Sequence, residues 1–385
     1  MQDKIVISSL FKYLLLSAIG IGLVSFVTGL FLAPERIWAS YLLSNYYFLS
    51  LTIGALFFAA IQSISQSGWS AAFKRIPEAL GTFLPFAGLL MLLLYFGLKY
   101  IYPWANSDLV STDEIIKNKT PYLNTIFWII RLIVFFGLWT LLSRSIRKES
   151  LKEDIHGGLT HFNRTELLSK IFIFVLAITF SLGTFDWMMS IDTKWFSTIY
   201  ALLNFIAGFQ HAVALIGLII IILNKLGYFK FFNNTHLSEY SNYIFMLSML
   251  WAYFWFCQYL LIWFANIPEE TIYYHPRIFG EFKIVFMLSL IFNFIIPFVV
   301  FLVKKVRKSK LAFIIVASIM LVGMWLDIYA EVMPGSVGSM HIGIYEIGVF
   351  IGFAGLFLYL FAQSLSKASL IPVNHPYLSE SLAHK

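Results

Sequence analysis

Residues 185–208 read FDWMMSIDTKWFSTIYALLNFIAG and join the end of one long apolar run to the start of the next. A short polar break with Asp192 and Lys194 separates the runs, and tryptophans flank it. Aromatic residues around a polar break are typical of a helix–loop–helix at a membrane surface. We therefore expect Asp192 and Lys194 to be solvated in that loop. Asp186 should lie just inside the membrane, where an acid is costly unless it is paired or faces a polar cavity.

The composition of the chain excludes an ordinary soluble domain. Of the 385 residues, 59% are hydrophobic and 12% are charged, and the mean hydropathy is +0.80. Soluble domains have roughly 25% charged residues. The apolar residues here fall in runs of about 20 or more, which is the length an α-helix needs to cross a bilayer. The sequence therefore predicts an all-α integral membrane protein.

The apolar runs predict ten transmembrane helices in a single domain, 1–366, followed by a cytoplasmic C-terminal tail, 367–385. The predicted spans are about 9–32, 41–61, 80–101, 122–143, 169–190, 196–223, 241–265, 283–303, 311–332 and 342–365. Only two connections are expected to be long loops, 102–121 outside and 144–168 inside.

The distribution of Lys and Arg predicts the orientation of these spans. Nineteen of the 27 basic residues lie at the termini or in the loops after even-numbered spans, seven lie in the other loops, and Arg131 lies within a span. The run KKVRKSK at 304–310 contributes most to this asymmetry. By the positive-inside rule, both termini are cytoplasmic. The same topology accounts for the net charge of +7, so a nucleic-acid partner is not expected.

Ionisable side chains inside the spans are the first candidate site residues, and their depth follows from the 1.5 Å rise per residue of an α-helix. Those that gather towards the outer half of the membrane are Arg131, Asp186, Asp327, Glu331 and Glu346. Asp327 and Glu331 are four residues apart and share one helix face. Glu331 is either interfacial, in contact with water, or part of a buried polar core.

Arg131 is expected to form a structural ion pair with Asp186 or Glu346, and a direct role in ligand binding or proton transfer is the alternative.

The sixth span carries a second polar pattern. Ser197, Asn204 and His211 recur every seven residues and so line one helix face over roughly 21 Å, with Gln210 beside them. Such a stripe can conduct protons through side chains and water, or it can hold helices together by hydrogen bonds. Together with the outer group, these residues are candidates for a proton path, and none is assigned as catalytic.

Redox centres are not expected in this chain. Cys257 is the single cysteine, so the chain alone cannot build an iron–sulfur site, and it has no CxxCH motif for covalent haem. A membrane-buried haem needs paired axial histidines, whereas His211 is the one histidine deep within a predicted span. No P-loop or HExxH motif is present, and no metal site is expected. A redox role would therefore require partner subunits.

Three blocks of the chain resemble a known family. FDWMMSIDTKWFSTIYALLNFIAGF at 185–209 resembles the signature of the ActF-type subunits of bacterial alternative complex III, which are NrfD/PsrC-like integral membrane proteins. LDIYAEVMPG at 326–335 and HIGIYEIGVF at 341–350 resemble that family as well. The resemblance implies two four-helix bundles, spans 2–5 and spans 6–9, flanked by spans 1 and 10.

The resemblance also implies a function. Alternative complex III is a quinol:cytochrome c, or quinol:electron-carrier, oxidoreductase of the bacterial inner membrane that oxidises menaquinol on the outer side. Iron–sulfur clusters and c-type haems are then held by partner subunits, next to a paralogous membrane subunit, with a terminal oxidase as a further candidate partner and lipid around the spans. The outer charged group would form an outer half-channel or quinol-proximal site, because quinol oxidation needs bases that accept protons. The sequence itself shows no apolar pocket of quinone size.

Two other functions stay open. A proton-coupled secondary transporter would show interrupted helices, repeats and a site at the midplane. The acids here lie away from the midplane, and no span is clearly interrupted. A structural anchor for extrinsic redox subunits would explain the intramembrane charges as ion pairs alone.

Overall fold

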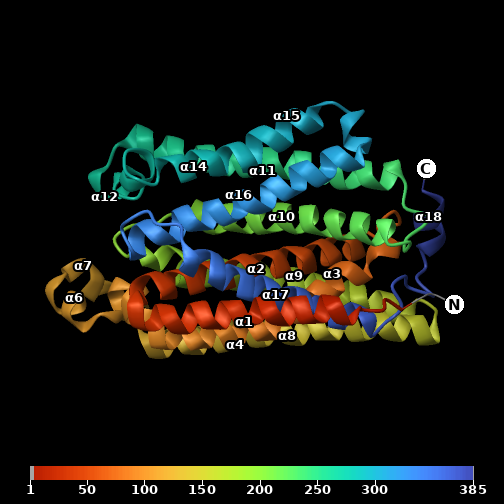
Figure 1. The fold of residues 1–385 in the computed structure, drawn as a ribbon, viewed down its shortest axis with the longest axis horizontal. Coiled ribbons are helices and arrows are strands. Elements are labelled where there is room, and N and C mark those ends of the chain that lie inside the picture. The colour runs from red at the N-terminus through yellow and green to blue at the C-terminus, as the bar shows by residue number, and fades with distance from the viewer. Residues whose placement is uncertain (1–3, 385) are drawn as a thin grey trace.

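The computed structural model describes residues 4–384, and all regular elements within them are helices (Figure 1). Ten helical segments are long and apolar enough to cross a membrane, which confirms the predicted all-α, ten-span architecture. Their bounds are α1 (Ser9–Leu32), α2 (Pro34–Ile64), a composite span (Ala71–Ile101), α8 (Thr125–His156), α9 with a final 3₁₀ turn (Thr160–Ile191), α10 (Thr198–Lys225), α11 (Asn234–Ala265), a second composite span (Lys283–Leu302), α16 (Lys310–Ser336) and α17 (Ile344–Ser366).

Shorter elements complete the chain. The first composite span consists of η1 (Ala71–Phe73), α3 (Arg75–Leu80), η2 (Gly81–Phe83), α4 (Leu84–Leu93), η3 (Leu94–Gly97) and α5 (Leu98–Ile101). The second consists of α14 (Lys283–Leu290), η6 (Ile291–Ile295) and α15 (Ile296–Leu302). The connections contain η4 (Pro103–Ala105), α6 (Ser107–Thr112), α7 (Glu114–Lys119), η5 (Met189–Ile191, the final turn of the fifth span), α12 (Pro268–Thr271), α13 (His275–Ile278), η7 (Val306–Lys308) and α18 (Leu378–Ala383).

The spans form two groups of four that meet along α2 and α10. In the first group α2, α4, α8 and α9 pack in a ring, and in the second α10, α11, α14–α15 and α16 do so. Helices α1 and α17 pack on each other and on α2, outside both rings (Figure 1). Buried residues occupy most of α2 and α10. These two helices are therefore the core of the molecule.

The two ends of the helical bundle carry different connecting elements. The N-terminus, α18 and the turn between α15 and α16 lie at one end, which we call the basic end because that turn is the KKVRKSK run (Figure 1). Helices α6, α7 and α12 lie at the opposite end, which we call the loop end.

The inner loop expected over 144–168 is mostly helical, which corrects the prediction. Helix α8 continues to His156 and α9 begins at Thr160. Gly157 follows α8 with a φ of 65°, a left-handed conformation that glycine adopts without a steric penalty. The last turns of α8 are polar, and ion pairs between neighbouring turns support them. Hydropathy alone cannot distinguish such a polar helix from a loop.

Two spans are interrupted, contrary to the expectation that no span is. The third span alternates between α and 3₁₀ turns from Ala71 to Ile101. The eighth contains the π-helical turn η6, followed closely by Pro297. Proline lacks the N–H that would bond the carbonyl four residues earlier, so a local change of helix type at this place has a physical cause.

Glycines allow the closest approaches between helices. A Cβ built on Gly54 of α2 would lie 2.4 Å from the carbonyl oxygen of Gly208 of α10. In the outer pair, a Cβ on Gly22 of α1 would lie 2.4 Å from the Cα of Gly352 of α17. Gly352 and Gly348 form a GxxxG pair, whose small residues let two membrane helices meet at backbone distance.

Replacing Gly54 with alanine should separate α2 from α10. We expect the free energy of unfolding in detergent to fall by about 1–3 kcal/mol, the usual cost of overpacking, seen as a lower melting temperature. Gly137→Ala in α8 is the control, because nothing lies within 4 Å of its Cβ position, and alanine is the better helix former there. Equal melting temperatures for the two variants would contradict the close contact.

Candidate functional site

Arg131 and Asp186 form a buried ion pair between α8 and α9. The Nε and Nη2 groups of Arg131 donate to the two carboxylate oxygens of Asp186 at 2.5 and 2.9 Å. Arg131 also donates to the carbonyl of Tyr122 at 3.1 Å, and its guanidinium lies 4.0 Å from the centre of the Tyr122 ring. Of the two expected partners, Asp186 is thus the one that Arg131 binds, and both charges are compensated.

Glu346 has a different partner and a different place. It accepts hydrogen bonds from Arg36 of α2, with a closest approach of 2.9 Å, and from the backbone N–H of Gly343 at 2.8 Å. It therefore caps the start of α17 and ties that helix to α2. Glu346 belongs to the contact between α2 and α17 and is not a partner of Arg131.

Glu331 of α16 starts a row of hydrogen-bonded side chains in the core. Its Oε1 accepts from the amide of Asn204 of α10 at 3.1 Å. The Asn204 Oδ1 accepts from the hydroxyl of Tyr46 of α2 at 3.0 Å, and that hydroxyl lies 3.3 Å from the Thr184 hydroxyl of α9. We call Glu331, Asn204, Tyr46 and Thr184 the central polar row. It connects the two four-helix groups through four different helices.

The carboxyl group of Glu331 forms no ion pair with any residue from 4 to 384, in contrast to Asp186 and Glu346. Its Oε2 is buried and has no hydrogen-bond partner in this part of the chain. Asp327, one turn earlier on α16, likewise forms no ion pair with any described residue. The structure therefore places Glu331 inside the protein and not in water, which decides between the two expectations for it.

Arg277 lies close to Glu331 but binds its backbone. This arginine of α13 is 1% exposed, pairs with Asp192 at 3.0 Å, and donates to the carbonyls of Ala330 and Glu331 at 2.8 and 3.1 Å. The expectation that Asp192 only solvates its loop is therefore wrong, because Asp192 neutralises a buried arginine. Lys194 of the same loop is half-exposed and pairs at 2.6 Å with Asp113, the N-cap residue of α7.

His211 lies in the core of the second group and contacts the π-helical turn η6. Its Nδ1 donates to the carbonyl of Ala207 at 2.6 Å, because a carbonyl can only accept. Its Nε2 lies 3.0 Å from the side-chain amide of Asn293, and Gln210 donates to the Asn293 carbonyl at 3.0 Å. An α-helix would bond that carbonyl to the N–H four residues on, which is Pro297 and has none.

The contact between His211 and Asn293 can exist in two protonation states. A neutral ring accepts at Nε2 and needs the amide NH₂ of Asn293 to face it, whereas a protonated ring donates and needs the amide oxygen. A rotation of one amide therefore accompanies gain or loss of a proton on His211.

The stripe predicted along α10 is present for two of its three members. Asn204 and His211 face the core two turns apart, about 10 Å along the helix axis. Ser50 of α2 contacts Gly208 between them, and its buried hydroxyl has no partner among the described residues. Ser197 precedes the helix as its N-cap residue. It therefore lies at the loop end and does not extend the stripe.

A cavity of about 440 Å³ lies at the loop end, next to the Arg131–Asp186 pair. Its walls are largely apolar and include Tyr122, Leu123, Phe185, Met189, Trp195 and Phe196. Ser190 also lines it and donates to the carbonyl of Asp186 at 2.7 Å. The buried indole N–H of Trp195 has no acceptor among the described residues. Pockets that hold small apolar ligands usually measure about 300–1,000 Å³, so the cavity is large enough for an aromatic ring system.

Comparison with known proteins does not assign this chain to a family. Neither a scan against protein-family models nor a search of curated proteins finds a match to this chain.

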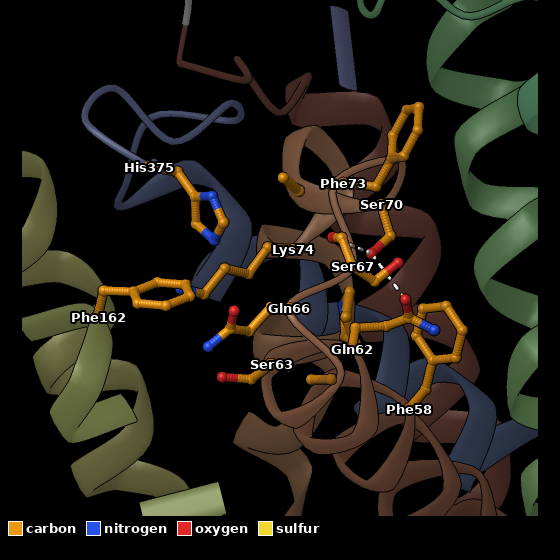
Figure 2. Close-up of a pocket in the computed structure, with 13 residues that line it drawn as sticks. Phe58, Gln62, Ser63, Gln66, Ser67, Ser70, Phe73, Lys74, Phe162 and His375 are labelled. Atoms are coloured by element: carbon orange, nitrogen blue, oxygen red, sulfur yellow. Dashed lines mark hydrogen bonds between the residues drawn. The ribbon is translucent and has the colours of Figure 1, made fainter. Parts of the chain in front are cut away.

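A second, smaller pocket at the basic end is where the C-terminal tail docks (Figure 2). Its lining includes Lys74, whose side chain extends below His375 towards the ring of Phe162 of α9. Its volume of about 30 Å³ is enough for one or two water molecules. Ser381 of α18 donates to the carbonyl of Trp69 at 2.8 Å and so holds the end of the tail in place. None of the predicted site residues lines this pocket.

Acidic pH should release the tail through His375. Burial, followed by the charges of Lys74 and Arg75, lowers the pKa of His375 from its ordinary 6.5 to about 3. Docking is therefore fully stable above about pH 6.5 and weakens as the pH falls towards 3. We expect proteolytic cleavage within residues 370–384 to be about tenfold faster at pH 5.5 than at pH 7.5. In His375→Gln this pH dependence should be absent, and its persistence would contradict the assignment.

Sequence reasoning missed several residues that complete these sites. Arg36 and Arg277 were assigned to loops because the charge count treats every loop arginine alike. Asn293 stands alone in an apolar run, which is a usable signal for a buried amide. Tyr46 and Thr184 carry no such signal, because tyrosine and threonine are common in membrane helices for packing reasons.

Proposed function

We propose that this chain is a membrane subunit of a respiratory quinol:electron-acceptor oxidoreductase of the alternative complex III type, in the bacterial inner membrane with both termini cytoplasmic. In this proposal the chain has no redox centre. Partner subunits hold the iron–sulfur clusters and c-type haems, and the chain conducts protons and contributes a quinol-proximal region. The resemblance of residues 185–209 to that family supports the assignment, and the geometry of the core supports the proton path.

One observation carries the proton path. Four buried polar atoms without a partner among the described residues lie along the contacts of α2, α10, α16 and η6: Glu331 Oε2, Ser50 Oγ, Gln210 Oε1 and Asn293 Nδ2. Buried polar atoms that lack a protein partner are normally satisfied by internal water. A water chain here would join the central polar row to His211, and both Glu331 and His211 can take up and release protons.

The loop-end cavity supports the quinol-proximal region. It combines apolar walls with a position beside the Arg131–Asp186 pair. A quinone ring needs apolar contacts of this kind. In this proposal menaquinol packs against these walls, and the loop end faces the outside of the cell.

A proton-coupled transporter is the second candidate function. The interruption of the eighth span at η6 favours it, because transporters bind substrates at broken helices. Glu331 lies closer to the loop end of α16 than to its middle, whereas Asp327 lies about one turn from the middle. A transporter site at the midplane would then consist mainly of Gln210, His211 and Asn293, with Asp327 as its nearest acid.

Purification of the full chain from its native membranes in a mild detergent distinguishes these functions. We expect it to co-purify with subunits that show c-type haem absorbance and iron–sulfur signals, and the assembly to oxidise menaquinol. A chain that purifies alone, and that moves a solute with protons in vesicles, would overturn the respiratory proposal. Co-purification without any effect of core substitutions on proton release would leave the chain as a structural anchor.

A further inference from the structure

A cavity at the basic end carries an excess of positive charge. It measures about 320 Å³ and lies between η2, α8 and α17. The lining residues used below are Glu78, Thr82, Phe86, Arg144, Arg147 and Lys367. It is separate from the central polar row and from the loop-end cavity.

Arg147 is held in this cavity by neutral groups. Its partners are the carbonyl of Glu78 at 3.3 Å, the hydroxyl of Thr82 at 3.0 Å, and the carbonyl of Ser364 at 2.9 Å together with its hydroxyl. None of these groups carries a charge. The guanidinium is therefore fixed in position by three elements, and it forms no ion pair with any residue from 4 to 384, although the charge of the nearby Glu78 carboxylate acts on it.

Glu78 is the one acid among the residues that line this cavity, and its carboxylate already has hydrogen-bond partners. The Glu78 carboxylate accepts from Arg75 at 2.7 Å and from the Ser150 hydroxyl at 2.5 Å. Arg144 and Lys367 are exposed, and neither forms an ion pair with any residue from 4 to 384. Three cations thus face one cavity, none of them in an ion pair with a residue from 4 to 384, and a single acid, Glu78, lies among them.

An apolar surface continues from this cavity towards the middle of the spans. Phe86 lines the cavity and is 39% exposed, and Leu89, one turn further along α4, is 61% exposed. Leu141 lies one turn before Arg144 on α8 and is 67% exposed. Helices α4 and α8 pack against each other, so these exposed side chains belong to one pair of neighbouring helices. A ligand with an anionic head and apolar chains matches this combination.

We propose that the cavity binds the phosphate head of an anionic phospholipid from the leaflet at the basic end, with the acyl chains on the exposed surface of α4 and α8. Arg147 provides a positive charge in a fixed position, and Arg144 and Lys367 provide further charges at the exposed rim. Basic pockets between membrane helices bind such head groups through charge-assisted hydrogen bonds. The inference is independent of the proposed respiratory function.

Lipid binding to the purified full chain tests the proposal. Native mass spectrometry in detergent would compare added phosphatidylglycerol with phosphatidylcholine for the wild type and for the double variant Arg144→Gln, Lys367→Gln. Both residues are exposed and make no side-chain bond within the described chain, so the fold should persist. Loss of two surface charges should weaken phosphatidylglycerol binding about 30-fold and leave phosphatidylcholine binding unchanged.

Two controls make the outcome decisive. Lys148→Gln removes an exposed cation of the same helix that does not line the cavity, and it should bind phosphatidylglycerol like the wild type. Inorganic phosphate at millimolar concentration should not displace the lipid, because it lacks the apolar chains. Unchanged binding by the double variant, equal loss in Lys148→Gln, or full displacement by inorganic phosphate would each overturn the lipid site.

Discussion

Glu331→Gln is expected to lower proton translocation by the assembled complex by about 100-fold or more, which is the usual range for loss of a positioned acid–base group. Glutamine keeps the shape of the side chain, and its Oε1 can still accept from Asn204 as Glu331 does. It cannot bind and release a proton. Proton release would be followed with a pH-sensitive dye in vesicles, while quinol oxidation and subunit content are measured on the same samples.

Glu346→Gln is the matched control for this experiment, because Glu346 is equally buried but paired with Arg36. Its loss should lower the melting temperature and leave the number of protons released per quinol unchanged in the complexes that assemble. Normal proton release in Glu331→Gln would contradict the path through the central polar row. An equal loss in both variants would point to assembly as the common cause.

Asp186→Asn is expected to destabilise the chain by about 3–5 kcal/mol, because it leaves the buried Arg131 without its counter-charge. The expected result is a markedly lower melting temperature and little assembled protein in the membrane. The double variant Arg131→Met, Asp186→Leu removes both charges and should recover most of that stability, because well-packed apolar residues often replace a buried pair without loss.

Quinol oxidation in whatever Asp186→Asn complex assembles gives the second readout. Turnover per complex should stay near the wild-type value if the pair is structural. A stable Asp186→Asn complex that has lost turnover would instead place Asp186 in the chemistry at the loop-end cavity. Recovery of stability but not of turnover in the double variant would support the same conclusion.

The ten spans could be predicted because a bilayer demands one property, an apolar run of sufficient length, and hydropathy measures that property directly. The Arg131–Asp186 pair could also be anticipated, since two opposite charges at similar depth have a strong reason to meet. Depth does not determine which helices are neighbours. Glu346 and Glu331 lie in the same depth range as Asp186 but bind other partners. Glu346 of α17 pairs with Arg36, and Glu331 of α16 accepts a hydrogen bond from Asn204.

The contact of His211 with Asn293 depends on a feature that periodicity does not show. A π-helical turn changes the direction in which the side chains within and after it point. The direction of the Asn293 side chain therefore cannot be predicted from a regular 3.6-residue repeat. Pro297 predicts a departure from regular α-helix nearby, but it does not determine the type of turn. Similarly, the loop-end cavity arises from the connections at that end, whose packing has no simple sequence pattern.

The glycine contact between α1 and α17 has a consequence for biosynthesis. Gly22 leaves the ribosome 330 residues before Gly352, yet their backbones touch in the finished protein. At about 5–20 residues per second, synthesis of the chain between them takes roughly 16–66 s. Throughout that time α1 lies in the bilayer without the partner that covers its glycine face. Helix α1 is thus inserted long before α17, the helix it packs on most, and the insertion machinery or the lipids must shield it in the meantime.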